Sequence, residues 1–139
     1  WALSEKPTAA YLRSFEGENL VERGAKLARL AKAVRADGGE LVVVILPLLY
    51  DFEHYPFTAA HQALVEFGQA SNIHMVDALA VLGTEKASEL WVHAIDHHPN
   101  EVAHAHVARA IFAHLKSQGL LSQLTKRMKI VDSPSHKDK

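Results

Sequence analysis

The pattern of apolar and polar residues along the chain predicts alternating helices and strands. The first periodic segment is 19–40, NLVERGAKLARLAKAVRADGGE. Its apolar residues recur at helical spacing with charged residues between them, and they are Leu20, Leu27, Leu30, Ala31 and Val34. Gly38 and Gly39 follow as a helix stop. The segment therefore predicts an amphipathic helix that lies on an apolar surface.

The next two segments predict a strand and a second helix. LVVVILP, residues 41–47, is apolar at every position, as in a parallel strand covered on both faces, and Pro47 ends it. In PFTAAHQALVEFGQASN, residues 56–72, Thr58 is a plausible N-cap. One side of this helix is predicted to carry Ala60, Leu64, Phe67 and Ala70.

The last two segments predict a short strand and a third helix. IHMVDAL favours a strand from Ile73 to Val76, with Asp77 at its carboxyl end. NEVAHAHVARAIFAHLKSQG favours a helix capped by Asn100 and ended near Gly119. The order is thus helix, strand, helix, strand, loop, helix.

This order predicts an α/β fold with a parallel sheet and helices on both faces. In such sheets, chemistry gathers beyond the carboxyl ends of the strands. Because two strands alone do not make a stable covered sheet, we expect further strands upstream of Trp1 and an exposed apolar sheet edge that associates with them or with a second copy. We expect residues 1–124 to form part of a single domain and the basic segment 125–139 to be a flexible tail.

Composition narrows the function classes. A formal net charge of −1 argues against nucleic-acid binding. The absence of cysteine excludes thiolate sites and a cysteine nucleophile. No apolar run approaches the roughly 18 residues of a membrane-spanning helix. Localisation stays open, because the chain begins at Trp1 and we expect a longer protein.

Several of the ten histidines crowd the stretch HAIDHHPNEVAHAHVA, which raises the question of a metal site. On a helix, His104 and His106 point roughly 200° apart and cannot hold one ion. A site from His93, His97 and His98 with a distant carboxylate stays open. His104 aligns with a predicted buried stripe and is interpreted as a core-edge histidine. Ordinary surface or edge positions are expected for the lone histidines His54, His61, His74 and His114.

The same stretch supports a catalytic interpretation. A carboxylate at Asp96 can accept a hydrogen bond from one ring nitrogen of His98, which leaves the other nitrogen to move a proton. Pro99 stiffens the loop and Asn100 opens the next helix. The chain contains no Gly-x-Ser-x-Gly or Gly-Asp-Ser motif, so it offers no credible nucleophile.

DHHPNEVAHAHVARAI resembles the last conserved block of the SGNH (GDSL-type) hydrolases, in which an Asp is followed by His-Pro-Asn, two variable residues, Gly-His and an apolar helix. LVVVILPLLYDFEHYPF resembles the family's penultimate strand with its exit loop, and IHMVDAL resembles the strand before the catalytic loop. This sequence has one residue between Asp96 and His98 where the family commonly has two, and Ala103 where Gly is usual.

The resemblance implies a three-layer α/β/α, flavodoxin-like SGNH hydrolase fold, of which this chain is the C-terminal part. It implies that Asp96 is the triad acid and His98 the base, with the adjacent His97 as the other candidate. The implied activity is ester hydrolysis through a serine nucleophile that lies outside this chain, on a small ester substrate and with no cofactor. The alternatives are a non-catalytic binding domain of the same fold and a histidine-rich metal site.

Overall fold

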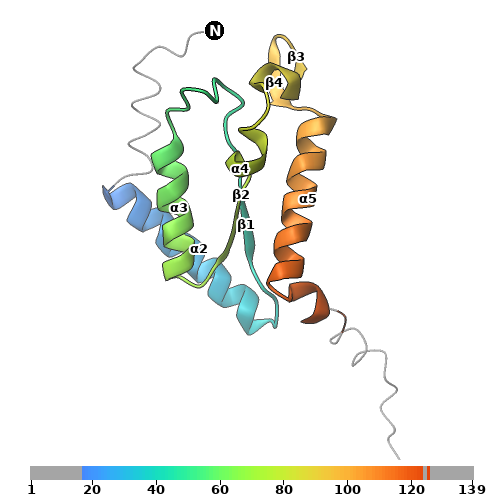
Figure 1. Ribbon diagram of the computed structural model, residues 1–139. Helices are drawn as coiled ribbons and strands as arrows, with labels where there is room; N and C mark the ends of the chain where they lie inside the picture. Colours follow the sequence, from blue (N-terminus) through green and yellow to red (C-terminus); the bar gives the residue numbers. More distant parts are fainter. Residues whose placement is uncertain (1–16, 124, 126–139) are drawn as a thin grey trace, which may run out of the picture.

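The computed structural model describes residues 17–123 and 125 of the 139-residue chain. It is a mixed α/β structure around a short parallel sheet of two strands, β1 (Val42–Ile45) and β2 (His74–Asp77). The helices α3 (Thr58–Ala70) and α5 (Glu101–Ser117) lie on either side of this sheet (Figure 1). Both helices contact β2. The predicted order of long helices and parallel strands is therefore confirmed for these elements.

The two parallel strands pair in register from Val42 with His74 to Ile45 with Asp77. Strand β2 runs one residue later than predicted, so Asp77 is its last residue. The prediction that the first strand is covered on both faces is not met within the described residues. Of β1 only Ile45 is buried, and its three valines are half-buried. Among these residues, no strand pairs with the other edge of β1.

The first described helix, α2 (Gly17–Ala36), confirms the predicted amphipathic helix, with Ala31 buried. Leu30 departs from the prediction, since 49% of it is exposed. Close packing on α3 explains the glycine in its middle, because a Cβ at Gly24 would lie 2.5 Å from Cε2 of Phe67. After the helix ends, Gly38 has a φ of 78°, a left-handed conformation that favours glycine.

Helix α3 begins one residue earlier than its predicted N-cap implied. Thr58 is the first helical residue rather than the N-cap, and its hydroxyl donates to the carbonyl oxygen of Tyr55 at 3.1 Å. The N-cap position is Phe57, which is buried and makes no side-chain cap. Burial of Phe57 thus replaces the predicted polar cap in fixing the start of the helix.

The stretch expected to be a loop between the second strand and the last helix contains regular structure. It holds a short helix α4 (Leu79–Leu82), a 3-10 turn η1 (Ala87–Leu90) and an antiparallel hairpin of β3 (Trp91–His93) with β4 (Asp96–Pro99). A buried cluster lies beneath this region and is formed by Leu49, Ala78, Leu82, Leu90 and Ala103. The hairpin therefore rests on a core that links β1's exit, α4 and α5.

Asn100 caps α5 as predicted. Its side-chain oxygen accepts from the backbone N–H groups of Val102 and Ala103, both at 3.0 Å. Its amide nitrogen donates to the carbonyl oxygens of Glu89 at 2.8 Å and Trp91 at 3.2 Å. One side chain thus joins the start of α5 to the hairpin.

The face of α5 predicted to be buried was wrong, because the helix is turned by one residue relative to the prediction. Ala103 is fully buried, whereas the neighbouring His104 is exposed. His104 is therefore not a core-edge histidine, because the helix turns the small Ala103 side chain inward instead.

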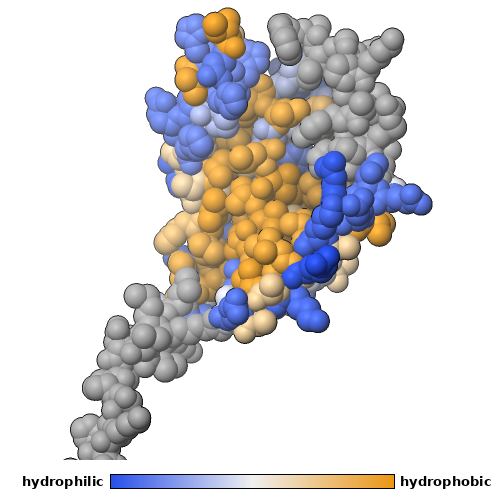
Figure 2. All heavy atoms as spheres, turned by 180° about the vertical axis from the view of Figure 1, so that it is seen from behind, coloured by the Kyte–Doolittle hydropathy of each residue, from blue (hydrophilic) through white to orange (hydrophobic). Residues whose placement is uncertain are grey.

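The face of the molecule shown in Figure 2 carries a broad apolar area. Exposed large apolar side chains of the described part include Leu46, Leu48, Ile95 and Phe112. The described residues contain no helix long and apolar enough to cross a membrane. Of the predicted tail, Thr125 is helical and its hydroxyl donates to the carbonyl oxygen of Leu121 at 3.0 Å. The rest of that tail lies outside the described residues.

Candidate active site

The two predicted catalytic residues lie together on β4. Asp96 Oδ1 is 2.5 Å from His98 Nδ1 and accepts the backbone N–H of His98 at 3.1 Å. An aspartate that accepts a backbone N–H two residues ahead forms a tight local turn, and this turn brings the ring of the same residue onto the carboxylate. The close approach of Asp96 to His98 thus follows from their spacing in sequence.

The electrostatics of this pair favour an ionised carboxylate. The hydrogen bond from the His98 side chain, followed by that from its backbone N–H, lowers the pKa of Asp96 from its ordinary value of 3.8. A carboxylate accepts only, so we assign the Nδ1 proton to His98. The Nε2 atom of the neutral ring is then a proton acceptor, and 86% of the side chain is exposed to solvent.

The pair borders a groove of about 760 Å³. One wall is the chain that leaves β1, residues 46–49, and the other is the hairpin from Ala94 to Pro99. Exposed Leu46 and Ile95 make the walls apolar, with 55% and 90% of their surfaces accessible. The groove thus combines an acid–base pair with apolar walls, as small-molecule sites do.

His97 takes a different position from His98. Its ring stacks on the indole of Trp91, with centroids 3.8 Å apart and planes 13° apart. Its Nε2 lies 3.3 Å from the carbonyl oxygen of Ala94. The indole nitrogen of Trp91 in turn donates to the carbonyl oxygen of Leu49 at 2.9 Å. Of the two adjacent histidines, His98 is therefore the one that contacts Asp96.

The groove offers no nucleophile of its own. Its described lining contains no serine, threonine or cysteine. Ser88 lines a different cavity, together with Glu85, Trp91 and His97. The described residues thus supply an acid–base pair alone.

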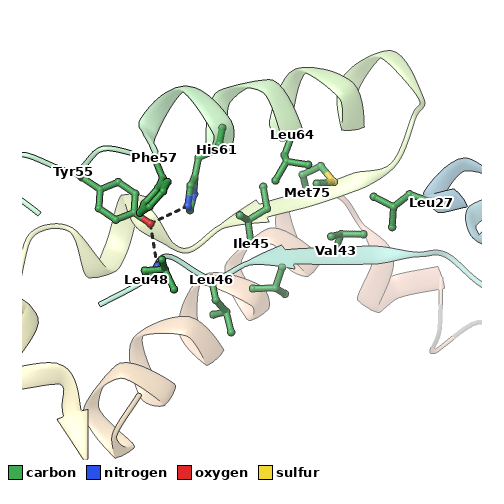
Figure 3. Close-up of a pocket in the computed structure, with 12 residues that line it drawn as sticks. Leu27, Val43, Ile45, Leu46, Leu48, Tyr55, Phe57, His61, Leu64 and Met75 are labelled. Carbon is green, nitrogen blue, oxygen red and sulfur yellow. Dashed lines mark hydrogen bonds between the residues drawn. The ribbon is translucent and has the colours of Figure 1, made fainter. Parts of the chain in front are cut away.

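A second Asp–His pair is buried near β2, and the sequence analysis missed it. His61 Nδ1 lies 2.7 Å from Asp77 Oδ1. Figure 3 shows the second contact of the ring, in which His61 Nε2 lies 3.3 Å from the hydroxyl of Tyr55. Only 7% of the His61 side chain is exposed. The expectation of a surface or edge position for His61 was therefore wrong. The signal was its spacing of three and seven residues from Leu64 and Gly68, which places it on the helix face that packs on the sheet.

The other lone histidines are closer to expectation. His54 is exposed and pairs with Asp51 at 3.3 Å. His74 and His114 are half-buried, with the Nδ1 of one 3.4 Å from the Nε2 of the other. Partial burial, followed by the charge of His74, lowers the pKa of His114 from 6.5.

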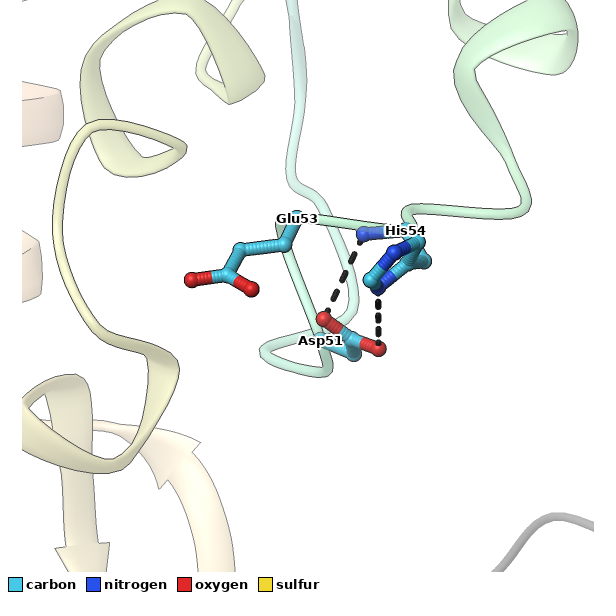
Figure 4. A group of neighbouring side chains, drawn as sticks. All are labelled: Asp51, Glu53 and His54. Carbon is cyan, nitrogen blue, oxygen red and sulfur yellow. Dashed lines mark hydrogen bonds and ion pairs between the residues drawn. The ribbon is translucent and has the colours of Figure 1, made fainter.

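The open possibility of a metal site at His93, His97 and His98 is not supported by the described residues. Among the described residues, the one set of possible ligand atoms that converges consists of Asp51, Glu53 and His54, in the loop after β1 (Figure 4). All three are exposed, and Asp51 is already engaged by the ring and the backbone N–H of His54. The contacts of His97 with Trp91 and of His98 with Asp96 direct these two rings to different partners.

Comparison of the chain with protein-family models, with curated proteins and with solved structures found no match.

Proposed function

We propose that Asp96 and His98 are the acid and base of an ester-hydrolysing site of the SGNH type. The observation that carries this proposal is the 2.5 Å contact between Asp96 Oδ1 and His98 Nδ1 at the edge of the apolar groove. Asp96 holds the ring in one tautomer and stabilises the imidazolium that forms when Nε2 takes a proton. The apolar walls suit the acyl or alcohol part of a small ester.

In this mechanism His98 Nε2 removes the proton of a serine hydroxyl as that oxygen attacks the ester carbonyl. The same proton then passes to the leaving alcohol, and water completes the cycle by the reverse route. The described lining of the groove has no hydroxyl group, so the proposal takes the serine from a segment outside this lining. The chain as given is therefore expected to be inactive by itself.

The proposed fold is the C-terminal part of a three-layer α/β/α, flavodoxin-like domain. The placement of α3 and α5 on either side of the β1–β2 sheet supports it (Figure 1). The further strands would pair with the second edge of β1, beside which apolar Leu46 and Leu48 are exposed. Self-association, or binding to the remaining part of the domain, follows from this edge. Sedimentation of the 139-residue chain as a strict monomer would contradict it.

The test is hydrolysis of p-nitrophenyl acetate by the full-length gene product and by its variants. We expect His98→Ala to lower kcat/KM by about 10³-fold or more, since acid–base groups contribute 10²–10⁴-fold. His54→Ala is the matched control, because His54 also pairs with an aspartate at the surface but lies outside the groove. Equal loss in both variants, or activity that survives His98→Ala, would refute the assignment.

A second candidate is a binding domain that keeps the fold without catalysis. The observation that favours it is the groove itself, which is apolar and lacks a nucleophile among its described residues. It predicts that the full-length product does not hydrolyse the ester. It also predicts that substitution of the apolar residues Leu46 or Ile95 changes ligand binding. An active full-length product would exclude this candidate.

A further inference from the structure

The buried contacts of His61 form a chain of hydrogen bonds that links three parts of the fold. Among the described residues with polar or charged side chains, His61 is the one classed as buried, with 5% of its surface exposed. Asp77 at the end of β2 pairs with Nδ1. Tyr55, from the loop before α3, contacts Nε2 (Figure 3). Asp77 Oδ1 also accepts the backbone N–H of Leu79 at 2.9 Å.

The direction of each hydrogen bond follows from the chemistry of the groups. The Asp77 carboxylate accepts, so His61 Nδ1 carries a proton and Nε2 of the neutral ring accepts from the Tyr55 hydroxyl. The hydroxyl oxygen then accepts the backbone N–H of Leu48 at 3.0 Å. One arrangement of protons therefore satisfies both ring nitrogens of His61, the Tyr55 hydroxyl and Asp77 Oδ1, which is typical of a polar network that fixes a single geometry.

This series of hydrogen bonds ends at Leu48, which belongs to the segment that forms one wall of the groove. Leu46 and Leu48 line the groove beside Asp96 and His98, and they also line the apolar pocket of about 290 Å³ that contains Tyr55 and His61 (Figure 3). The segment 46–49 is thus a thin partition between the two cavities. It lies outside β1, which ends at Ile45, so the sheet hydrogen bonds do not hold it.

The other side of the same segment is attached to the hairpin. The carbonyl oxygen of Leu49 accepts from the indole of Trp91, and that indole stacks on His97, the residue before His98. The backbone N–H of Leu48 therefore donates to Tyr55, and the carbonyl oxygen of the next residue, Leu49, accepts from the hairpin.

We propose that Asp77, His61 and Tyr55 form a positioning relay that sets the segment 46–49 against the hairpin, and so sets the width of the groove at Asp96 and His98. These three residues act through Leu48 and do not touch a ligand. The proposal does not depend on ester hydrolysis, because a groove that only binds a ligand needs the same wall. The proposal gives the His61–Asp77 pair a positioning role and leaves the His98–Asp96 pair as the one that lines the groove.

The test uses nuclear magnetic resonance on the full chain with Tyr55→Phe, which removes only the hydroxyl and keeps the ring contacts with Phe52 and Phe57. We expect the Leu48 amide to exchange with solvent about tenfold faster, the effect of losing one hydrogen bond. We also expect shifts of the Trp91 indole N–H and the His98 ring signals. Asp77→Asn, which keeps an acceptor for Leu79, should move the same signals. His54→Gln is the control and should move none of them.

Three results would overturn the proposal. The first is a folded Tyr55→Phe or Asp77→Asn protein in which the Trp91 and His98 signals are unchanged, since a merely structural relay lowers stability without moving them. The second is an unprotected Leu48 amide in the unaltered protein. The third is a His61 ring protonated at Nε2 alone, as read from its nitrogen shifts. The last two need no variant, so the proposal is tested even if a substitution prevents folding.

Discussion

The two Asp–His pairs of this chain use the same atoms in opposite surroundings. In each, a histidine Nδ1 faces an aspartate Oδ1, at 2.7 Å for His61 and Asp77 and at 2.5 Å for His98 and Asp96. The side chains of the first pair are 7% and 25% exposed, and those of the second are 86% and 47% exposed. The buried ring has partners on both nitrogens, whereas the exposed ring pairs through Nδ1 and belongs to a residue that lines the groove. The buried pair therefore links parts of the fold, whereas the exposed pair is accessible for proton transfer.

The largest expected difference between the pairs is in stability. His61→Ala removes the ring that pairs with both Asp77 and Tyr55 and opens a space in the core, so we expect the free energy of unfolding to fall by about 2–4 kcal/mol. His98→Ala removes a solvent-exposed ring, and we expect a much smaller change in its denaturation midpoint. Urea unfolding followed by circular dichroism measures both. Similar losses in the two variants would contradict the division between the pairs.

A smaller loss is expected when the buried network loses one hydroxyl. Tyr55→Phe removes the donor to His61 and the acceptor of Leu48 while keeping the ring, so we expect a loss of about 1 kcal/mol. His54→Gln alters an exposed pair in the same loop and should leave the midpoint in place. The two urea transitions, measured side by side, check this. A Tyr55→Phe protein as stable as the unaltered one would mean that the hydroxyl makes no net contribution.

The exposed pair should be visible in a titration rather than in stability. The hydrogen bond from His98 lowers the pKa of Asp96, so the His98→Ala variant should return it toward 3.8. A depressed carboxyl pKa stabilises the folded state above the pKa of the unfolded chain, and this contribution is lost as the pH falls through the folded value. Carbon-13 titration of the Asp96 carboxyl group measures the shift. An Asp96 pKa that is the same in His98→Ala would contradict the hydrogen bond between Asp96 and the His98 ring.

The smallest effect is expected at the half-buried pair of His74 and His114, which lies between the two extremes. Because burial is the larger cause of the lowered pKa of His114, His74→Gln should raise that pKa only part of the way toward 6.5. The depressed pKa adds stability that is complete above 6.5 and is lost as the pH falls from there through the folded value. Proton titration of the His114 ring is the measurement. Full recovery to 6.5 would make His74 the main cause instead.

The accuracy of sequence-based prediction here depends on how local each contact is. Asn100 was predicted as a cap because its partners, Val102 and Ala103, are two and three residues away. Asp96 and His98 are two residues apart, so their contact needed no knowledge of the fold. The partnership of His61 and Asp77 crosses from α3 to β2, and neither residue signals it alone.

The errors have equally specific causes. The phase of α5 was wrong because the large apolar residues of that helix suggested a face that excludes Ala103, and a small side chain carries little signal although it is fully buried. The hairpin was missed because Asp96, His97 and His98 are polar and Pro99 follows them, which disfavours a strand. Trp91 stacks on His97 across the hairpin, and its indole donates to the distant carbonyl oxygen of Leu49, which no local pattern signals.

The short hairpin has a consequence for the order in which the groove assembles during folding. Strands β3 and β4 are joined by Ala94 and Ile95 alone, and hairpins of this kind close in about 1–10 μs. The parallel pairing of β1 with β2 must first close the long crossover through α3, and such non-local contacts form more slowly. When the complete chain refolds, the strands of the hairpin can therefore pair before the segment 46–49 is in place beside them. Asp96 and His98 meet early, and the groove beside them is completed late.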